Sequence, residues 1–334
     1  MNITIIGAGG FGTTISILLA EKGHSVKLWA NFPELAFELN KNRENKDFLP
    51  GFIIPDNIKI CSDLGESVDS SELIIIAIPS KYFRNCISEL SRVIDTSKKY
   101  FLSLTKGIDD KNFKLMSDVF FEVFSEGIRE RFMVLSGPNL AVEIARKVPT
   151  SSVIAGWSLK TVEKIQKVMS TEYFRIYSGN DPIGVQIGGA YKNVIAIAAG
   201  ICDGLEFGNN TKASLISRGL AEMVRFGVEA GALPHTFYGL SGMGDLVATS
   251  YSPLSRNRTF GEKIGRGENP NLLQKNSKMV IEGAVNVRAF YESAKKKEVE
   301  SPIVDTVYRI LYEDLSPFEA VNELMSRKLK FEIY

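Results

Sequence analysis

Gly7-Ala8-Gly9-Gly10-Phe11-Gly12 directly follows a short apolar run at residues 3–6 and precedes a helical segment that we expect over residues 13–22. In a strand–turn–helix unit with this spacing, the first glycine permits the tight turn and the second lets the backbone approach a pyrophosphate. The third glycine, Gly12, allows the helix to pack closely on the strand. The unpaired N–H groups of the helix N-terminus would then face the phosphates. We therefore predict a dinucleotide-binding unit on Gly7, Gly9 and Gly12.

The first 180 residues alternate short β-branched runs with helical stretches. The strands that we predict cover residues 3–6, 26–29, 73–77, 100–103, 133–135, 152–155 and 174–177. Strands separated by helices are typical of a mainly parallel sheet that is covered on both faces. Residues 73–78 are apolar without alternation, which indicates a central buried strand. The predicted fold class is α/β, with an N-terminal Rossmann-like, doubly wound sheet.

The strand signal fades after residue 180, and long helical segments replace it. We predict helices over residues 185–205, 211–230, 281–297 and 302–313. Helical periodicity without strands favours a second, all-α domain. We therefore expect a nucleotide-binding domain over residues 1–184 and a helical substrate and catalytic domain over residues 185–334.

Composition narrows the classes of function. The 334 residues are 44% hydrophobic and carry 40 basic and 39 acidic side chains, so there is no basic footprint for nucleic acid. Three dispersed cysteines fit neither a disulfide framework nor a zinc ribbon, and we expect a cytoplasmic protein without a metal site. The longest apolar runs, at residues 73–78 and 194–202, are shorter than the roughly 18 residues that suggest a membrane span, so we expect no stable membrane insertion.

The end of the second strand bears on the choice of cofactor. An acidic residue there binds the ribose hydroxyls of NAD, whereas a cation compensates the 2′-phosphate of NADP. The sequence has Asn31 at this point, which is neither. Because an amide can hydrogen-bond a hydroxyl or a phosphate oxygen, Asn31 does not choose between the two cofactors.

Lys192 is the strongest catalytic candidate. It lies in Gly188-Gly189-Ala190-Tyr191-Lys192-Asn193-Val194, among neighbours that are almost all apolar. Burying an ammonium is costly unless it is paired or its pKa falls. A lysine with a lowered pKa could protonate a carbonyl oxygen as hydride reaches the carbon. From the residues alone, this hypothesis and that of a structural lysine whose charged end reaches the surface are equally well supported.

Three further segments carry polar groups suited to an anionic substrate. Lys106 follows the strand at residues 100–103, at the edge where doubly wound sheets bind ligands. Asp245 follows a glycine pair that predicts a tight turn. Arg256 and Asn257 stand at the start of a predicted helix, where a guanidinium, an amide and free N–H groups form a compact site for a phosphate monoester. Taken singly, each segment is also compatible with an ordinary polar loop.

Together these segments resemble the bacterial type of NAD(P)-dependent glycerol-3-phosphate dehydrogenase, from Gly7 to the helix around residues 319–321. The blocks that carry the resemblance are Asn45-x-x-Phe48-Leu49-Pro50-Gly51, Ala77-Ile78-Pro79-Ser80, Thr105-Lys106-Gly107, Ser136-Gly137-Pro138, Gly188-Gly189-Ala190-Tyr191-Lys192-Asn193, Gly244-Asp245-Leu246 and Leu254-Ser255-Arg256-Asn257-Arg258. The family interconverts dihydroxyacetone phosphate and sn-glycerol 3-phosphate and supplies the backbone of phospholipids.

The resemblance implies one NAD(P)(H) per chain, a phosphotriose substrate and Lys192 as the proton donor or acceptor. The implied substrate-binding residues are Lys106, Gly137, Asn139, Asn193, Asp245, Thr249, Ser255, Arg256 and Asn257. The implied cofactor-binding residues are Gly7, Gly9, Gly10, Phe11, Gly12, Asn31, Lys106, Ala141, Arg256 and Glu282. Three positions depart from the family pattern: it often has serine at Gly10 and Asn139, and commonly arginine or histidine at Asn31.

Two other functions remain open from the sequence. A related two-domain reductase for another small hydroxy or keto acid would need a carboxylate clamp in place of Arg256 and Asn257. A nucleotide-binding redox sensor would need neither Lys192 nor Asp245. The helical domain also offers surfaces for a homodimer.

Overall fold

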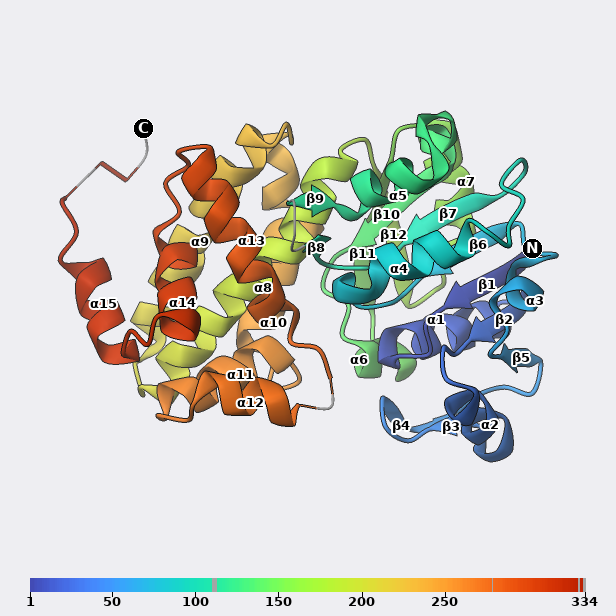
Figure 1. Ribbon diagram of the computed structural model, residues 1–334, viewed down its shortest axis with the longest axis horizontal. Helices are drawn as coiled ribbons and strands as arrows, with labels where there is room; N and C mark the ends of the chain where they lie inside the picture. Colours follow the sequence, from blue (N-terminus) through green and yellow to red (C-terminus); the bar gives the residue numbers. More distant parts are fainter. Residues whose placement is uncertain (110–112, 278, 330, 333–334) are drawn as a thin grey trace.

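The computed structural model describes residues 1–109, 113–277, 279–329 and 331–332. A sheet domain and a helical domain lie side by side along the longest axis of the molecule (Figure 1). The sheet has the strand order β12-β11-β10-β7-β6-β1-β2-β5. Its strands are β1 (Asn2–Ile6), β2 (Ser25–Trp29), β5 (Ile58–Cys61), β6 (Leu73–Ile76), β7 (Tyr100–Ser103), β10 (Phe132–Ser136), β11 (Thr150–Gly156) and β12 (Phe174–Gly179).

Every neighbouring pair in this sheet is parallel except β10 and β11, so the prediction of a mainly parallel sheet is confirmed. All seven predicted strands are present. The edge strand β5 was not predicted, because its four residues include an exposed lysine and are too few to show a clear strand periodicity. Two short hairpins were also missed: β3 (Glu44–Asn45) with β4 (Leu49–Ile53), and β8 (Ile108–Asp109) with β9 (Lys114–Leu115).

Helices cover both faces of the sheet. They are α1 (Gly10–Glu21), α2 (Pro33–Asn42), α3 (Leu64–Val68), α4 (Ser80–Leu90), α5 (Met116–Phe124), α6 (Ala141–Ala145) and α7 (Leu159–Met169), with a 3₁₀ turn over Glu126–Arg131. The central strand β6 shows why the sheet is doubly wound. Leu73 and Ile75 pack in one core with α1 and α7, whereas Ile74 and Ile76 pack in the other with α4 and α5. All four are fully buried, as the unbroken apolar run predicts.

The second domain is helical throughout the residues that the structure describes after β12. Its elements are α8 (Pro182–Gly204), α9 (Asn209–Glu229), a 3₁₀ turn (Pro234–Tyr238), a π-helical turn (Leu240–Gly244), α10 (Asp245–Tyr251), α11 (Arg256–Gly265), α12 (Pro270–Asn276), α13 (Glu282–Lys296), α14 (Pro302–Tyr312) and α15 (Pro317–Met325). The prediction of an all-α second domain is confirmed. Each of the four predicted long helices is present within a few residues of its predicted ends.

The central helix α8 begins earlier than predicted. Proline occupies its first turn, and the Asp181 side chain accepts a hydrogen bond from the N–H of Gly184 at 2.8 Å, which together start the helix at Pro182. The predicted division between residues 184 and 185 thus falls inside the first turn of α8, and this boundary stays a prediction. The helix is long and apolar enough to cross a membrane, yet its most apolar window is wholly buried inside the protein.

A hairpin from the sheet domain anchors the two domains to each other. Ile108 and Leu115 of β8 and β9 belong to the core of the helical domain. Between them, the ring of Phe113 lies 5.1 Å from the ring of Phe226 and 5.6 Å from that of Phe290. Because this hairpin begins just after Lys106, the packing also ties the Lys106 loop to the helical domain.

Glycines bring α8 and α11 into direct backbone contact. A side-chain carbon added at Gly200 of α8 would lie 1.9 Å from the carbonyl oxygen of Arg258. One added at Gly204 would lie 2.2 Å from the carbonyl oxygen of Glu262. On the facing helix, a carbon at Gly261 would lie 2.0 Å from the carbonyl oxygen of Ile197. Small residues four apart on both helices therefore allow an approach that a side chain would prevent. This approach places the start of α11 beside the middle of α8.

We predict that Gly200→Ala destabilises the protein. Alanine gains about 1 kcal/mol over glycine in a helix interior, but a methyl group pressed against the Arg258 carbonyl forces the two helices apart. Overpacking of this kind costs typically about 1–3 kcal/mol, and against backbone we expect it to exceed the gain. Chemical denaturation would measure the free energy of unfolding. The control is Gly65→Ala in α3, where the added carbon meets ordinary contacts of 3.4 Å or more; equal stability of the two variants would refute the packing argument.

Candidate active site

The glycine loop has the geometry that a pyrophosphate requires. Gly7 has a φ of +113°, a backbone conformation that residues with a side chain rarely adopt. A side-chain carbon added at Gly12 would lie 2.0 Å from the carbonyl oxygen of Gly7. A carbon at Gly9, by contrast, would meet nothing within 4 Å, so one face of the loop is open. The helix α1 begins at Gly10 and not at residue 13 as predicted, because the glycines themselves adopt its first turn. No side chain caps its N-terminus, which leaves these N–H groups for a ligand.

Three other predicted cofactor residues, Phe11, Asn31 and Ala141, belong to the sheet domain and lie near the loop or the end of β2. The carbonyl of Ala141 accepts a hydrogen bond from the Thr14 hydroxyl of α1 at 3.2 Å, so Ala141 lies beside the loop. Phe11 is partly buried within it, and Asn31 is exposed just beyond the end of β2. A dinucleotide lying along this edge would pass these residues in turn. The residues present therefore fit the cofactor.

A buried carboxylate joins two lysines at the boundary between the domains. Asp245 is 1% exposed, and its Oδ1 lies 2.9 Å from Nζ of Lys192 while its Oδ2 lies 2.6 Å from Nζ of Lys106. Lys192 also donates to the Thr249 hydroxyl at 2.6 Å, and Lys106 to the carbonyl oxygen of Gly137 at 2.7 Å. Among the described residues each ammonium thus has two hydrogen-bond acceptors for its three N–H bonds, which leaves a third N–H for a ligand.

The local structure explains how residues from distant segments meet here. Gly188 and Gly189 of α8 have no side chain, and this allows close contact with the carbonyl of Ser241 and the hydroxyl of Ser136. The segment before Asp245 was predicted as a tight glycine turn; it is a π-helical turn that runs directly into α10. Because the turn continues as helix, Asp245 and Thr249 lie one turn apart on the same face, and their side chains are hydrogen-bonded at 3.1 Å.

The electrostatics of this cluster are those of an acid–base pair near neutrality. The pKa of Lys192 is lowered to about 8, mainly by burial; the charge of Asp245 opposes this shift, and those of Lys106 and Arg256 add to it. Burial alone would raise the pKa of Asp245, but the two lysines outweigh burial and hold that pKa below its usual value. Asp245 is therefore ionised, whereas Lys192 exchanges its proton close to physiological pH.

The predicted phosphate residues lie at the start of α11 beside α8. Ser255 caps α11 by accepting a hydrogen bond from the N–H of Arg258 at 3.2 Å. Asn257 is buried, donates to the side chain of Asn193 at 2.9 Å and accepts from the N–H of Gly283 at 2.9 Å. Ser255 and Asn257 therefore hold helices in place, a role that sequence analysis did not foresee. Arg256 is exposed, and its one hydrogen bond that the structure records is to the carbonyl oxygen of Val280 at 3.3 Å.

Glu282 and Asn139 have partners that sequence analysis missed. Glu282, the first residue of α13, accepts hydrogen bonds from the N–H and the hydroxyl of Ser80 at 3.1 and 2.6 Å. These bonds link the helical domain to the start of α4 in the sheet domain. Asn139 accepts a hydrogen bond from the hydroxyl of Ser152, and its Nδ2 is buried without a hydrogen-bond partner among the residues that the structure describes. The contact between Ser80 and Glu282 had one signal in the sequence, because Ser80 follows β6 at the edge of the sheet where ligands bind.

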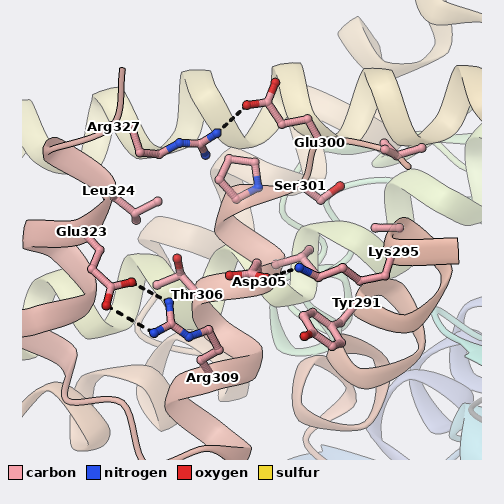
Figure 2. Close-up of a pocket in the computed structure, with 14 residues that line it drawn as sticks. Tyr291, Lys295, Glu300, Ser301, Asp305, Thr306, Arg309, Glu323, Leu324 and Arg327 are labelled. Carbon is pink, nitrogen blue, oxygen red and sulfur yellow. Dashed lines mark hydrogen bonds and ion pairs between the residues drawn. The ribbon is translucent and has the colours of Figure 1, made fainter. Parts of the chain in front are cut away.

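A separate surface cavity of about 330 Å³ lies among α13, α14 and α15 (Figure 2). Its three basic side chains are each paired with an acidic one: Lys295 with Asp305, Arg309 with Glu323 and Arg327 with Glu300. The lining residues are distinct from the cluster around Asp245, and their charges compensate one another. The cavity thus has no polar group of the candidate active site.

Family profiles and known relatives match this chain over most of its length. Residues 2–162 match the profile of the NAD-dependent glycerol-3-phosphate dehydrogenase N-terminus, and residues 181–322 match that of the C-terminus of the same family. The glycerol-3-phosphate dehydrogenase [NAD(P)+] of Citrifermentans bemidjiense is 44% identical over 99% of this chain and 98% of its own length. That of Carboxydothermus hydrogenoformans is 40% identical over 100% and 98%.

Solved structures extend the similarity to three dimensions. The crystal structure of glycerol-3-phosphate dehydrogenase from Coxiella burnetii has a TM-score of 0.93 and 36% identity, covering 98% of this chain and 99% of that one. A ketopantoate reductase from Ralstonia eutropha, at 13% identity and a TM-score of 0.60, covers 96% of this chain and 100% of its own and shares the fold alone. The resemblance found in the sequence is confirmed: this chain belongs to the NAD-dependent glycerol-3-phosphate dehydrogenase family and is an NAD(P)-dependent oxidoreductase.

Proposed function

We propose that this protein reduces dihydroxyacetone phosphate to sn-glycerol 3-phosphate, and catalyses the reverse reaction, with Lys192 transferring the proton. One observation carries the proposal: a buried lysine with a pKa of about 8 directs two N–H bonds to Asp245 and Thr249 and has one left for the substrate. A group with a pKa near the working pH can both give and take a proton.

Each member of the cluster has a distinct part in the reduction. A nicotinamide dinucleotide held at the glycine loop would supply hydride to the carbonyl carbon. Lys192 donates its free proton to the carbonyl oxygen as negative charge develops there. Asp245 and Thr249 hold the Lys192 ammonium in place, and Asp245 keeps it charged until transfer. Lys106, held by Asp245 and Gly137, offers a second N–H to the same oxygen or to the neighbouring hydroxyl. Fixed donors of this kind stabilise developing charge without reorganisation.

The phosphate group would bind at the N-terminus of α11. Arg256 is exposed there and can turn its planar fork to two phosphate oxygens. Asn257 retains one amide N–H beyond its bond to Asn193, and the first turn of the ten-residue helix adds its own dipole. Three cations, Lys106, Lys192 and Arg256, outnumber Asp245 and Glu282, which suits a dianionic substrate.

The two other functions considered from the sequence fit these contacts less well. A reductase for a hydroxy or keto acid would need a carboxylate clamp in place of Arg256 and Asn257, whereas Arg256 at the N-terminus of α11 suits a phosphate group. A redox sensor would not need a buried lysine joined to a second lysine through Asp245.

We further propose a cytoplasmic location, a role in supplying glycerophospholipid backbones and a homodimeric state. Asn31 leaves the choice between NADH and NADPH open.

We predict that Lys192→Met strongly reduces turnover but retains dinucleotide binding. Methionine keeps much of the volume and removes the proton donor, so kcat should fall by about 10² to 10⁴. Steady-state oxidation of NADH with dihydroxyacetone phosphate would measure turnover, and titration calorimetry would measure binding. Lys212→Met is the matched control, because Lys212 is also buried and paired with an aspartate, Asp203, at 2.8 Å. Turnover by the Lys192 variant within a few-fold of the wild type would refute the role.

The pH dependence should have opposite signs in the two directions. Reduction needs protonated Lys192, so kcat/KM should fall as the pH rises above about 8. Oxidation needs the neutral amine, so kcat/KM should fall as the pH drops below about 8. Asp245→Asn removes the charge that raises this pKa and should move the midpoint to lower pH, whereas Lys106→Met should move it to higher pH. Profiles of residual activity test this, and shifts in the same direction would contradict it.

Arg256→Gln should weaken binding of the phosphate group selectively. A hydrogen bond to a charged group contributes about 1.5–3 kcal/mol, so KM for dihydroxyacetone phosphate should rise at least about tenfold. The rate with unphosphorylated dihydroxyacetone should be unaffected. Arg266→Gln, at the exposed opposite end of α11, serves as the control. If the wild type reduced both substrates equally well, the assignment of a phosphate site at Arg256 would be refuted.

A further inference from the structure

The β3–β4 hairpin packs across the glycine loop, and its polar contacts have no part in the function described so far. Asn45 of β3 is 1% exposed, and its Nδ2 donates to the carbonyl oxygen of Ala8 at 2.9 Å and to the hydroxyl of Thr13 at 2.8 Å. These two acceptors lie on either side of Gly9 to Gly12. One amide group therefore bridges both ends of the loop. Figure 1 shows the hairpin beside the N-terminal helix α1.

The orientation of one peptide group follows from this contact. In a trans peptide the C=O and the N–H point in opposite directions, and the described chain has no cis peptide bond. The Ala8 carbonyl points at Asn45, so the N–H of Gly9 points away from the hairpin. That N–H lies at the start of α1, where no side chain caps the helix and where the space beside Gly9 is open. It is thus directed towards the proposed pyrophosphate position.

Without a fixed partner this peptide group would turn easily. Gly9 has no side chain, and a glycine adopts positive and negative φ with similar ease. A turned peptide would present the Ala8 carbonyl oxygen to a phosphate, where like partial charges repel. A second contact limits the loop from the same side: a carbon at Gly10 would lie 2.6 Å from the carbonyl oxygen of Phe48 in this hairpin.

We propose that Asn45 is a positioning residue for the cofactor, which holds the Ala8–Gly9 peptide so that the Gly9 N–H faces the pyrophosphate. This inference rests on the proposed use of a nicotinamide dinucleotide. It concerns cofactor affinity and not the proton transfer at Lys192. In this proposal Asn45 acts on the cofactor through the loop peptide.

The test measures binding of adenosine diphosphoribose, which carries the pyrophosphate but no nicotinamide. We expect Asn45→Ala and Asn45→Asp to raise its dissociation constant by about tenfold or more in titration calorimetry. The aspartate variant keeps the size of the side chain but loses both N–H donors. In steady-state assays KM for the dinucleotide should rise in parallel, while kcat and KM for dihydroxyacetone phosphate at saturating cofactor change by less than a few-fold.

The matched control is Asn40→Ala. The Asn40 amide also donates to two carbonyl oxygens of the sheet domain, those of Ala36 and Ile60, at 3.0 and 3.1 Å, but it does not contact the loop. It should lower the melting temperature without changing affinity. Should the Asn45 variants fail to fold, Thr13→Val removes one of the two contacts and is expected to weaken binding by a few-fold.

The outcomes separate this inference from the proposed function. Folded Asn45 variants, or Thr13→Val in their place, that bind adenosine diphosphoribose as tightly as the wild type would overturn the role of Asn45. Wild-type protein that binds the nucleotide but does not reduce dihydroxyacetone phosphate would overturn the proposed reaction and leave that role intact.

Discussion

The ionised carboxylate of Asp245 holds together groups from three parts of the chain. Lys106 comes from the sheet domain, Lys192 from the central helix α8 and Asp245 itself from α10. Removing one partner of a buried ion pair costs about 3–5 kcal/mol, because the remaining charge is left without compensation. Because Asp245 has two positive partners, it does not depend on Lys192 alone for its ionised state. Lys192 can therefore release a proton without leaving Asp245 unpaired. The same arrangement thus organises the boundary between the domains and supplies a group that exchanges a proton near pH 8.

Close backbone packing makes this arrangement possible. Gly188 and Gly189 let β10 and the π-helical turn approach one side of α8, while Gly200 and Gly204 let α11 approach another. The Gly188–Gly189 pair directly precedes the segment that carries Lys192. The packing role of this pair and the proposed chemical role of Lys192 share one requirement. The ammonium must be buried and still reach a carboxylate from another helix. The hairpin at β8 and β9 serves the same end from the sheet domain, because it ties the Lys106 loop to the helical core.

The cofactor side shows the same division of labour between direct contact and support. The glycine loop offers N–H groups, but glycine by itself does not choose the direction in which they point. Asn45 lies 33 residues after Gly12, in a strand of two residues whose pattern is too short to identify, and its amide orients the loop through Ala8. Glu282 has a comparable place at the domain boundary, where it binds the start of α4 through Ser80.

Sequence patterns alone determined seven strands of the main sheet, the long helices of the second domain and the glycine loop, because these depend on periodicity and on local backbone freedom. They also singled out Lys192, since a charge within an apolar helix needs a partner. The identity of that partner was decided only by the tertiary structure, because Asp245 is 53 positions away and a carboxylate after a glycine pair predicts no particular contact. The same holds for Asn257, which was expected to bind phosphate and also connects α8 to α13, and for the bridge from Asn45 to the glycine loop. Hydrogen bonds between distant segments have no period, so only the folded chain shows which donors meet which acceptors.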